Sequence, residues 1–266
     1  MKRILTIAGS DSGGGAGIQA DIKTITVLGG YGMSVITALT AQNTLGVQGV
    51  HPVPVSFIAR QLDSVLSDIG ADAAKTGMLA NPEIVEVVAD GIRRYQVKTL
   101  VVDPVMVAKS GDSLLSSDAR DTIKKVLLPL AGVVTPNLPE AEVLSGISVG
   151  TISEMKEAAR IILDMGPAYV VIKGGHLEGD AVDLLFDGES FQEFPAPRLR
   201  QKNTHGTGCT FSAALATFLG QGFLTGKAVE MAKEFITEAI TAGILIGSGY
   251  GPANPYAHIL RMRKEA

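Results

Sequence analysis

The segment at residues 204–214, with the sequence THGTGCTFSAA, carries the strongest chemical signal in the chain. Gly206 and Gly208 free the backbone to turn, and the small residues that follow are typical of the start of an apolar helix. Backbone N–H groups at such a helix start point toward one ligand, and the helix dipole adds positive potential there. The segment therefore predicts an anion hole, suited to the charge that develops on a phosphoryl group during its transfer.

Cys209 is the only cysteine in the chain and falls at or near the N-terminus of this predicted helix. We expect that position to lower the pKa of the thiol, which favours a chemical role. A simpler interpretation makes Cys209 a small packing residue and the glycines a plain connection between two elements. A single cysteine also excludes an intrachain disulfide, so a secreted disulfide scaffold is not expected.

Three common motifs are incomplete or misplaced in this sequence. The glycine loop at residues 9–17 lacks the third glycine of a dinucleotide-binding fingerprint, because Ile18 occupies that position. Residues 226–227 resemble the end of a phosphate-binding loop, but Ala228 stands where Ser or Thr would bind magnesium. Residues 146–150 match the G-x-S-x-G pattern of hydrolases, yet a predicted helix rather than a strand precedes them.

The composition is that of a compact globular protein, with 46% hydrophobic and 19% charged residues in a chain of 266. The net charge of −4 and the lack of a basic run argue against a nucleic-acid partner. The apolar stretch at residues 4–8 is too short for a signal peptide, and no later stretch has the length of a membrane span. We therefore expect a cytoplasmic protein that binds neither nucleic acid nor membrane.

Short β-branched apolar runs alternate with segments of helical period, without a linker, repeat or low-complexity tract. Runs that are apolar throughout are typical of strands buried on both faces, so the pattern predicts an α/β fold with a mostly parallel central sheet. We expect a single domain over residues 1–266, with a β-hairpin at 183–194. The predicted strands are 4–8, 33–41, 71–76, 100–102, 132–134 and 169–172. The predicted helices are 18–28, 55–69, 82–95, 116–128, 208–219 and 225–246, and Pro139 is expected to open a further one.

The loops that follow the predicted strands are rich in Gly, Asp, Asn and Lys. Ligands of open parallel sheets bind beyond the carboxyl ends of the strands, so this edge is the candidate functional site. The loops are residues 9–17, 42–44, 77–78, 103–111, 136–140 and 174–176.

Seven stretches, in order through nearly the whole chain, resemble the ribokinase superfamily, specifically the hydroxymethylpyrimidine and phosphomethylpyrimidine kinases of thiamine biosynthesis. They are IAGSDSGGGAGIQAD (7–21), AQNT (41–44), KTGML (75–79), DPVM (103–106), TPNLPEAE (135–142), KGGH (173–176) and THGTGC (204–209). The resemblance implies a ribokinase-like three-layer fold with helices on both sides of the sheet. It also implies a magnesium-dependent kinase that uses ATP to phosphorylate 4-amino-5-hydroxymethyl-2-methylpyrimidine and then its monophosphate.

By this resemblance, the anion hole consists of Gly206, Thr207, Gly208 and Cys209, and Thr207 also contacts ATP. Cys209 stands where most ribokinase relatives carry an aspartate base, so its thiolate would accept the proton of the substrate hydroxyl. A thiolate is a weak base toward an alcohol, and positioning and charge stabilisation would then supply most of the rate.

The resemblance also implies contacts to magnesium and ATP. Asn137 and Glu140 match the N-x-x-E pattern of the superfamily, which organises magnesium, often through water, and Asp103 is a second candidate for that water shell. Lys173 is expected to contact the ATP phosphates, and Lys233 to line the nucleotide pocket. The simpler alternatives are a favourable first-turn charge at Glu140, a strand-end lysine at Lys173 and a solvated charge at Lys233.

Gln42 is the candidate for reading the substrate ring, because its amide offers both a donor and an acceptor to an aminopyrimidine. The resemblance implies that Asp21, Met78 and Val105 line the same pocket, and that Gly9 lets the backbone approach the ligand. The alternative for Asp21 is an ordinary exposed carboxylate on a helix. Met78 and Val105 could equally be core residues.

Two other functions stay open from the sequence. One is a pyridoxal or pyridoxine kinase of vitamin B6 salvage, a closely related fold whose substrate is a hydroxymethylated pyridine, with Gln42 as the discriminating position. The other is a non-catalytic nucleotide- or vitamin-binding module, against which the retained Asn137, Glu140 and Lys173 argue. Residues 109–112 resemble the segment that covers the site in such kinases and excludes water. Similar proteins are usually dimers, so we expect a homodimer.

Overall fold

The computed structural model describes residues 1–265 with the exception of 107–115, 176, 178 and 200. The predicted covering segment at 109–112 lies outside the described residues, as does His176 of the predicted 174–176 loop.

A nine-stranded sheet runs in the order β3-β2-β1-β4-β5-β6-β7-β8-β9 within the described residues. The six neighbouring strands β2-β1-β4-β5-β6-β7 pair in parallel. At the two edges, β3 pairs antiparallel with β2, β8 with β7, and β9 with β8. The mostly parallel sheet and the hairpin at 183–194 are thus confirmed. The strands are β1 (Arg3–Asp11), β2 (Tyr31–Asn43), β3 (Gly46–Pro52), β4 (Ala73–Thr76), β5 (Leu100–Val102), β6 (Val133–Val134), β7 (Tyr169–Ile172), β8 (Asp183–Phe186) and β9 (Phe191–Phe194).

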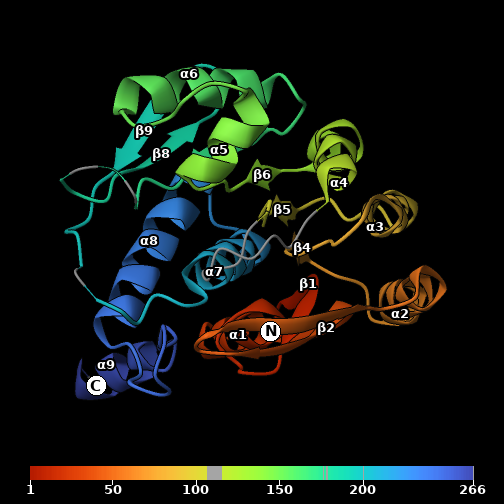
Figure 1. The fold of residues 1–266 in the computed structure, drawn as a ribbon, viewed down its shortest axis with the longest axis horizontal. Coiled ribbons are helices and arrows are strands. Elements are labelled where there is room, and N and C mark those ends of the chain that lie inside the picture. Colours follow the sequence, from red (N-terminus) through yellow and green to blue (C-terminus); the bar gives the residue numbers. More distant parts are fainter. Residues whose placement is uncertain (107–115, 176, 178, 200, 266) are drawn as a thin grey trace.

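Helices cover both faces of this sheet. They are α1 (Gly17–Val27), α2 (Val55–Asp68), α3 (Pro82–Arg94), α4 (Ser117–Thr122), α5 (Leu138–Ser145), α6 (Ile152–Leu163), α7 (Thr207–Gln221), α8 (Thr225–Thr241) and α9 (Ala257–Glu265). One hydrophobic core joins the sheet to α2–α6, and a second joins it to α1, α7 and α8. Figure 1 shows β4, β5 and β6 between α7 on one side and α3 and α4 on the other, so the predicted three-layer arrangement is confirmed.

The central strands are apolar throughout because their side chains alternate between the two helical layers. In β5, Leu100 and Val102 pack in the core that contains α2–α6, whereas Val101 packs in the core that contains α7 and α8. In β7, Val170 and Val171 divide between the two cores in the same way. This double burial explains why the strands read as continuous apolar runs in the sequence.

Side-chain caps set the start of four helices. Asn81, Ser116, Asn137 and Thr151 each accept a hydrogen bond from a backbone N–H group in the first turn of α3, α4, α5 and α6. Each cap satisfies a donor that has no acceptor inside the helix. The cap at Ser116 agrees with the helix start predicted at residue 116, and the cap at Asn137 lies beside the functional site described below.

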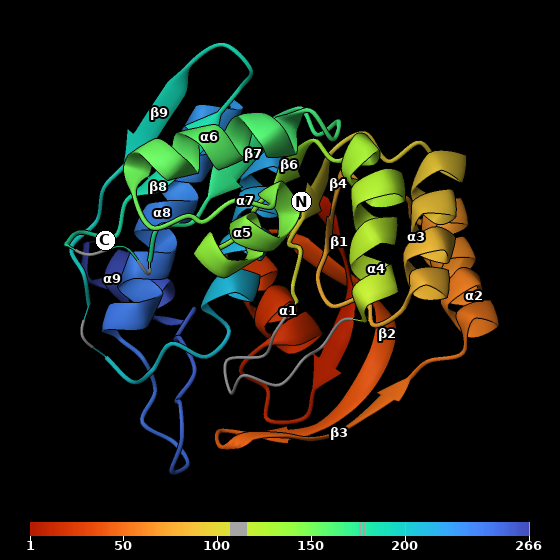
Figure 2. The ribbon, with the colours of Figure 1, turned by 45° about the horizontal axis from the view of Figure 1, so that its top comes forward.

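Three elements were missed by the sequence prediction. Strand β3 is largely exposed and contains glycine and proline, and its order comes from antiparallel pairing with β2 (Figure 2). Helices α6 and α9 occupy stretches in which no helix was predicted. The helix predicted at 225–246 was drawn too long: α8 ends at Thr241, because the chain turns at Gly243 against Asn203 and pairs the N–H of Ile244 with the carbonyl of Pro252.

None of the helices in the described part of the chain combines the length and the apolar character that a membrane span requires.

Candidate active site

A cavity of about 720 Å³ opens at the carboxyl ends of the parallel strands. Its wall includes the carboxyl-terminal ends of β1 and β2, the loops after β1, β4, β5, β6 and β7, and the first turn of α7, which is the edge that the sequence predicts. The structure brings almost all of the predicted site residues to this one cavity. They are Gly9, Gln42, Met78, Asp103, Val105, Asn137, Glu140, Lys173, Gly206, Thr207, Gly208, Cys209 and Lys233.

The predicted anion hole lies at the start of α7. Gly206 is the N-cap with a φ of +75°, and a side chain there would clash with the carbonyl oxygen of Gly15, so both the conformation and the space require glycine. A Cβ atom on Gly208 would lie 3.3 Å from Lys173 Nζ and 3.6 Å from Asp103 Oδ2. The first-turn N–H groups of a helix have no acceptor within it. The Thr207 N–H reaches the Thr204 carbonyl at 3.4 Å, and the start of α7 faces the lysine.

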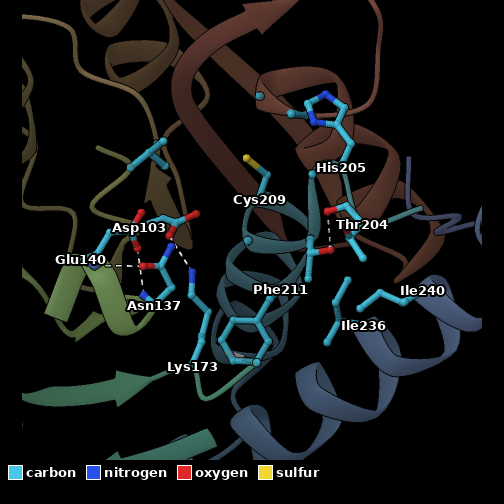
Figure 3. Close-up of a pocket in the computed structure, with 18 of the residues that line it drawn as sticks. Asp103, Asn137, Glu140, Lys173, Thr204, His205, Cys209, Phe211, Ile236 and Ile240 are labelled. Carbon is cyan, nitrogen blue, oxygen red and sulfur yellow. Dashed lines mark hydrogen bonds and ion pairs between the residues drawn. The ribbon is translucent and has the colours of Figure 1, made fainter. Parts of the chain in front are cut away.

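Asp103 and Lys173 form an ion pair in the cavity wall. Lys173 Nζ lies 3.0 Å from Asp103 Oδ1 (Figure 3). Ser212 donates to the other carboxylate oxygen at 3.1 Å. Burial alone would lower the pKa of Lys173, but the charges of Asp103 and Glu140 outweigh it and raise that pKa. The lysine is therefore a fixed positive charge, as a contact to phosphate requires.

Asn137 and Glu140 form a capping box at the start of α5. The Glu140 N–H donates to Asn137 Oδ1 at 2.9 Å, and the Asn137 N–H donates to Glu140 Oε2 at 2.8 Å (Figure 3). Burial raises the pKa of Glu140 to about 7, against the opposing charge of Lys173 and with a further increase from Asp103. The N-x-x-E spacing of Asn137 and Glu140 thus caps α5 and also places both side chains on the cavity wall.

Cys209 lies in the first turn of α7 with its thiol on the cavity side (Figure 3). The prediction of a lowered thiol pKa is wrong. Burial raises the pKa of Cys209 to about 11; Lys75 opposes this increase, whereas Asp21 and Asp103 add to it. The loss of hydration and the nearby carboxylates therefore outweigh the helix N-terminus.

Asp21 is not among the described residues that line the cavity. Its carboxylate is fully buried, 2.9 Å from the equally buried Lys75 Nζ, and it accepts a hydrogen bond from Thr6 Oγ1 at 2.6 Å. The expectation of a pocket-lining side chain is therefore wrong, as is the alternative of an exposed one. The side chain faces inward because α1 packs on the sheet and presents Asp21 to Lys75 of β4.

His205, whose role the sequence analysis left unassigned, joins two parts of the wall. Its Nε2 lies 2.9 Å from Asp11 Oδ2 and 3.3 Å from the Gln42 amide. Burial alone would raise the pKa of Asp11, but hydrogen bonds from His205, Ala16 and Gly13 outweigh it and lower that pKa. The sequence signals were present, since His205 precedes the glycines of α7 and Asp11 opens the glycine loop.

Lys233 is not the solvated charge of the alternative interpretation. Its Nζ lies 2.9 Å from Asp183 Oδ1, which also accepts the Gly174 N–H at 2.9 Å, and both side chains are largely buried. An apolar stretch of the wall lies beside them, on α7 and α8, and was not predicted. It includes Phe211, Ile236 and Ile240 (Figure 3).

A phosphoryl group at the start of α7 would meet helix N–H groups and the Lys173 ammonium together, at the carboxyl edge of a three-layer parallel sheet. Fold and site therefore define a small-molecule kinase of the ribokinase type. The sequence profile of the phosphomethylpyrimidine kinase family matches residues 11–254. The chain belongs to this family and is a kinase.

Curated relatives agree over nearly the full chain. The hydroxymethylpyrimidine/phosphomethylpyrimidine kinase of Bacillus subtilis is 50% identical over 259 residues, which cover 97% of this chain and 96% of that protein. The Escherichia coli protein of the same name is 50% identical over 96% of this chain and 98% of its own length. A bifunctional thiamine biosynthesis protein of Geobacter sulfurreducens is 54% identical, but the chain spans about half, 52%, of its length.

Solved structures of two kinds share the fold. The Bacillus subtilis pyridoxal kinase, in an ADP complex, has a TM-score of 0.91 and 42% identity and covers 98% of this chain and 99% of its own. A Staphylococcus aureus pyridoxal kinase with AMP-PCP and pyridoxal has a TM-score of 0.90, with 40% identity, 97% of this chain and 95% of its own. The phosphomethylpyrimidine kinase of Clostridium difficile has a TM-score of 0.81 and 45% identity, with 90% and 100% coverage.

Proposed function

We propose that this chain transfers phosphate from ATP to 4-amino-5-hydroxymethyl-2-methylpyrimidine, and then to the resulting monophosphate, in thiamine biosynthesis. The observation that carries the proposal is one cavity shared by Gln42, which suits an aminopyrimidine, and the start of α7, which suits a phosphoryl group. The volume of about 720 Å³ is in the range of small-molecule sites, roughly 300–1,000 Å³. Family membership and the names of the curated relatives agree with it.

The pyrimidine binds beside Gln42, with apolar contacts from Met78 and Val105. Gly9 leaves room for the ring, because a Cβ atom there would lie 3.3 Å from the sulfur of Met78. The substrate hydroxyl then faces Cys209. In the first reaction its oxygen attacks the γ-phosphorus of ATP, the bond to the bridging oxygen breaks, and ADP leaves.

Cys209 contributes by positioning the substrate hydroxyl rather than by removing its proton. A thiol with a pKa of about 11 is protonated at neutral pH, so the free enzyme holds no preformed thiolate to accept the hydroxyl proton. We infer that Cys209 orients the hydroxyl, and that residues 206–209 stabilise the transferred phosphoryl group through their N–H groups. The proton leaves the hydroxyl late, when its oxygen is already bonded to phosphorus, and passes to an oxygen of the transferred phosphoryl group.

ATP lies along the wall from α7 to α8. Lys173 and Thr207 contact the phosphates, and Lys233 lines the nucleotide pocket. The Thr207 hydroxyl, which donates to the Thr204 carbonyl at 2.8 Å in this structure, turns toward the phosphates when ATP binds. The apolar stretch that includes Phe211, Ile236 and Ile240 offers a surface for the base.

Magnesium fits the side chains at the phosphate end. Asp103, Asn137 and Glu140 present hard oxygen atoms to the cavity, and Mg²⁺ binds through one or two carboxylates, waters and substrate phosphates. When bound, the ion neutralises phosphate charge as transfer proceeds.

Pyridoxal is the second candidate substrate. The observation in its favour is the likeness to pyridoxal kinases, with TM-scores of 0.91 and 0.90 at 42% and 40% identity. Pyridoxal carries no amino group next to its ring nitrogen, so it matches the donor and acceptor of Gln42 less completely.

ADP release with Mg²⁺ and ATP tests the proposal, with hydroxymethylpyrimidine, its monophosphate and pyridoxal as acceptors. We expect turnover with both pyrimidines and a lower kcat/KM for pyridoxal. K173M should abolish most of the activity, whereas the matched control K227M, an exposed lysine paired with Glu230, should not. Preference for pyridoxal would replace the substrate, and no turnover with any acceptor would refute the proposal.

We also propose that residues 1–266 form one catalytic domain that acts in the cytoplasm as a homodimer. Sedimentation equilibrium of the purified chain should give twice the 27.7 kDa of one chain. A monomer at micromolar concentration would contradict the homodimer.

A further inference from the structure

The ring of His205 contacts the side-chain amide of Gln42 in the cavity wall. In the structure Gln42 Nε2 lies 3.3 Å from His205 Nε2 and Gln42 Oε1 lies 3.2 Å from Thr40 Oγ1, and a half-turn of the amide exchanges these two atoms. The oxygen and nitrogen of an amide have nearly the same size, so the neighbouring donors and acceptors decide which is which. Figure 3 shows His205 on the far side of Cys209 from Lys173, away from the phosphate end of the site.

The contact to Asp11 fixes the hydrogen on the ring. Asp11 Oδ2 lies 2.9 Å from His205 Nε2 and also accepts the N–H groups of Gly15 at 3.0 Å and Ala16 at 2.8 Å. These hydrogen bonds favour the ionised carboxylate, which can only accept, so Nε2 must carry the hydrogen. A protonated Nε2 has no lone pair for an amide N–H, and the Gln42 atom that faces it must therefore be the oxygen.

The other end of the amide gives the same answer independently. Thr40 Oγ1 donates its single hydrogen to the carbonyl of Ser10 at 2.9 Å. It has no second hydrogen for an amide oxygen, but its lone pairs can accept from an amide nitrogen. Every donor then meets an acceptor with the Gln42 nitrogen toward Thr40 and its oxygen toward His205.

We propose that His205, held by Asp11, is a specificity-positioning residue that locks the Gln42 amide in this orientation. With these contacts made, the amide keeps one N–H and one oxygen lone pair for the cavity, where Gln42, Thr40 and His205 all form part of the wall. That pair complements a ring nitrogen next to an exocyclic amine, which an aminopyrimidine has and pyridoxal lacks. The inference rests on the proposed pyrimidine substrate.

Kinetics of two variants test the assignment. H205L removes the ring N–H, so it should lower kcat/KM for hydroxymethylpyrimidine by roughly 10- to 100-fold, mainly through KM. H205Q keeps an N–H near the Nε2 position and should recover most of the loss. The KM for ATP and the affinity for ADP, measured by calorimetry, should change little in both, because the nucleotide end does not contain His205. The preference for pyrimidine over pyridoxal should fall in H205L alone.

Long-range ¹H–¹⁵N correlation of the histidine rings tests the proton directly, without turnover. The His205 signals, assigned by their loss in H205Q, should show a hydrogen on Nε2. An unprotonated Nε2 would overturn the proposal. So would an H205L variant in which kcat/KM falls equally for the pyrimidine and for pyridoxal, or in which the KM for ATP rises.

The wild-type protein, assayed in parallel, separates the two claims. Wild-type turnover of the pyrimidine with an unaffected H205L overturns only the role of His205. A wild type that turns over no pyrimidine overturns the proposed function, and with it the specificity assigned to His205.

Discussion

At the scale of single residues, burial governs the chemistry of Cys209. A cysteine in the first turn of a helix is normally activated by the helix dipole. Here burial raises its pKa to about 11, and the nearby Asp21 and Asp103 oppose ionisation, although Lys75 favours it. The thiol is consequently neutral in the free enzyme, and we expect it to react slowly with alkylating reagents.

Alkylation of Cys209 measures this directly, since it is the only cysteine in the chain. Iodoacetamide should label the free enzyme at pH 7.5 more slowly than it labels glutathione. The rate should rise about tenfold per pH unit, without a plateau below pH 10. Fast labelling with a plateau near neutral pH would mean a thiolate. C209A should lower kcat by roughly 10²-fold or more, and full activity of C209A would remove Cys209 from the mechanism.

Glu140 makes stability depend on pH. Burial raises its pKa from the usual 4.5 to about 7, so folding favours the protonated form. That contribution is fully present below pH 4.5 and is lost as the pH rises through 7. The free energy of unfolding of E140Q, relative to wild type, should therefore increase by up to about 3 kcal/mol between pH 4.5 and pH 8. Urea unfolding at both pH values checks this, with the exposed E157Q as control; an unchanged difference would contradict the raised pKa.

At the scale of elements, the start of α5 combines a cap with two site residues. N137A removes the side chain that accepts the Glu140 N–H at 2.9 Å, and should cost about 1 kcal/mol of stability and most of the activity. T151A removes the comparable cap of α6, which accepts the Glu154 N–H at 3.2 Å away from the cavity. It should cost similar stability and leave kcat/KM unchanged. Thermal unfolding and ADP-release assays distinguish them; equal activity losses would make Asn137 a structural residue only.

At the scale of the whole molecule, the cavity joins segments from opposite ends of the chain. His205 pairs with Asp11 across the wall, and the backbone of His205 bonds to Gly251 and Ala253. The first two strands and helices α7 and α8 thus line one cavity. A ligand that contacts both ends should stabilise the entire fold, because it binds only the folded arrangement.

Ligand-induced stabilisation tests this arrangement. A non-hydrolysable ATP analogue with Mg²⁺, at a hundred times its Kd, should add about 2.7 kcal/mol, which corresponds to a rise in Tm of roughly 5–10 °C. In K173M the rise in Tm with the ATP analogue should be smaller than in wild type. The smaller rise that hydroxymethylpyrimidine alone produces should be unchanged. Differential scanning fluorimetry measures both, and identical nucleotide shifts in wild type and K173M would remove Lys173 from the ATP site.

Local sequence patterns were sufficient for the framework and for most of the cavity wall. Strands such as β5 are apolar throughout because both faces are buried, and the glycines at 206 and 208 mark the helix start. Parallel strands end at the same edge, so the loops after them had to meet. That is why Gln42, Asp103, Glu140 and Lys173, far apart in the chain, were predicted to share one site.

Only the tertiary structure decided the charge and orientation of individual groups. Asp21 is buried against Lys75, fifty-four residues away, rather than lining the cavity. The thiol of Cys209 is neutral because of the residues packed around it, and the Gln42 amide lies against His205, 163 residues distant. Strand β3 exists through its pairing with β2. Periodicity and motifs report local preference, whereas hydration, charge and hydrogen bonding depend on neighbours that only the folded chain brings together.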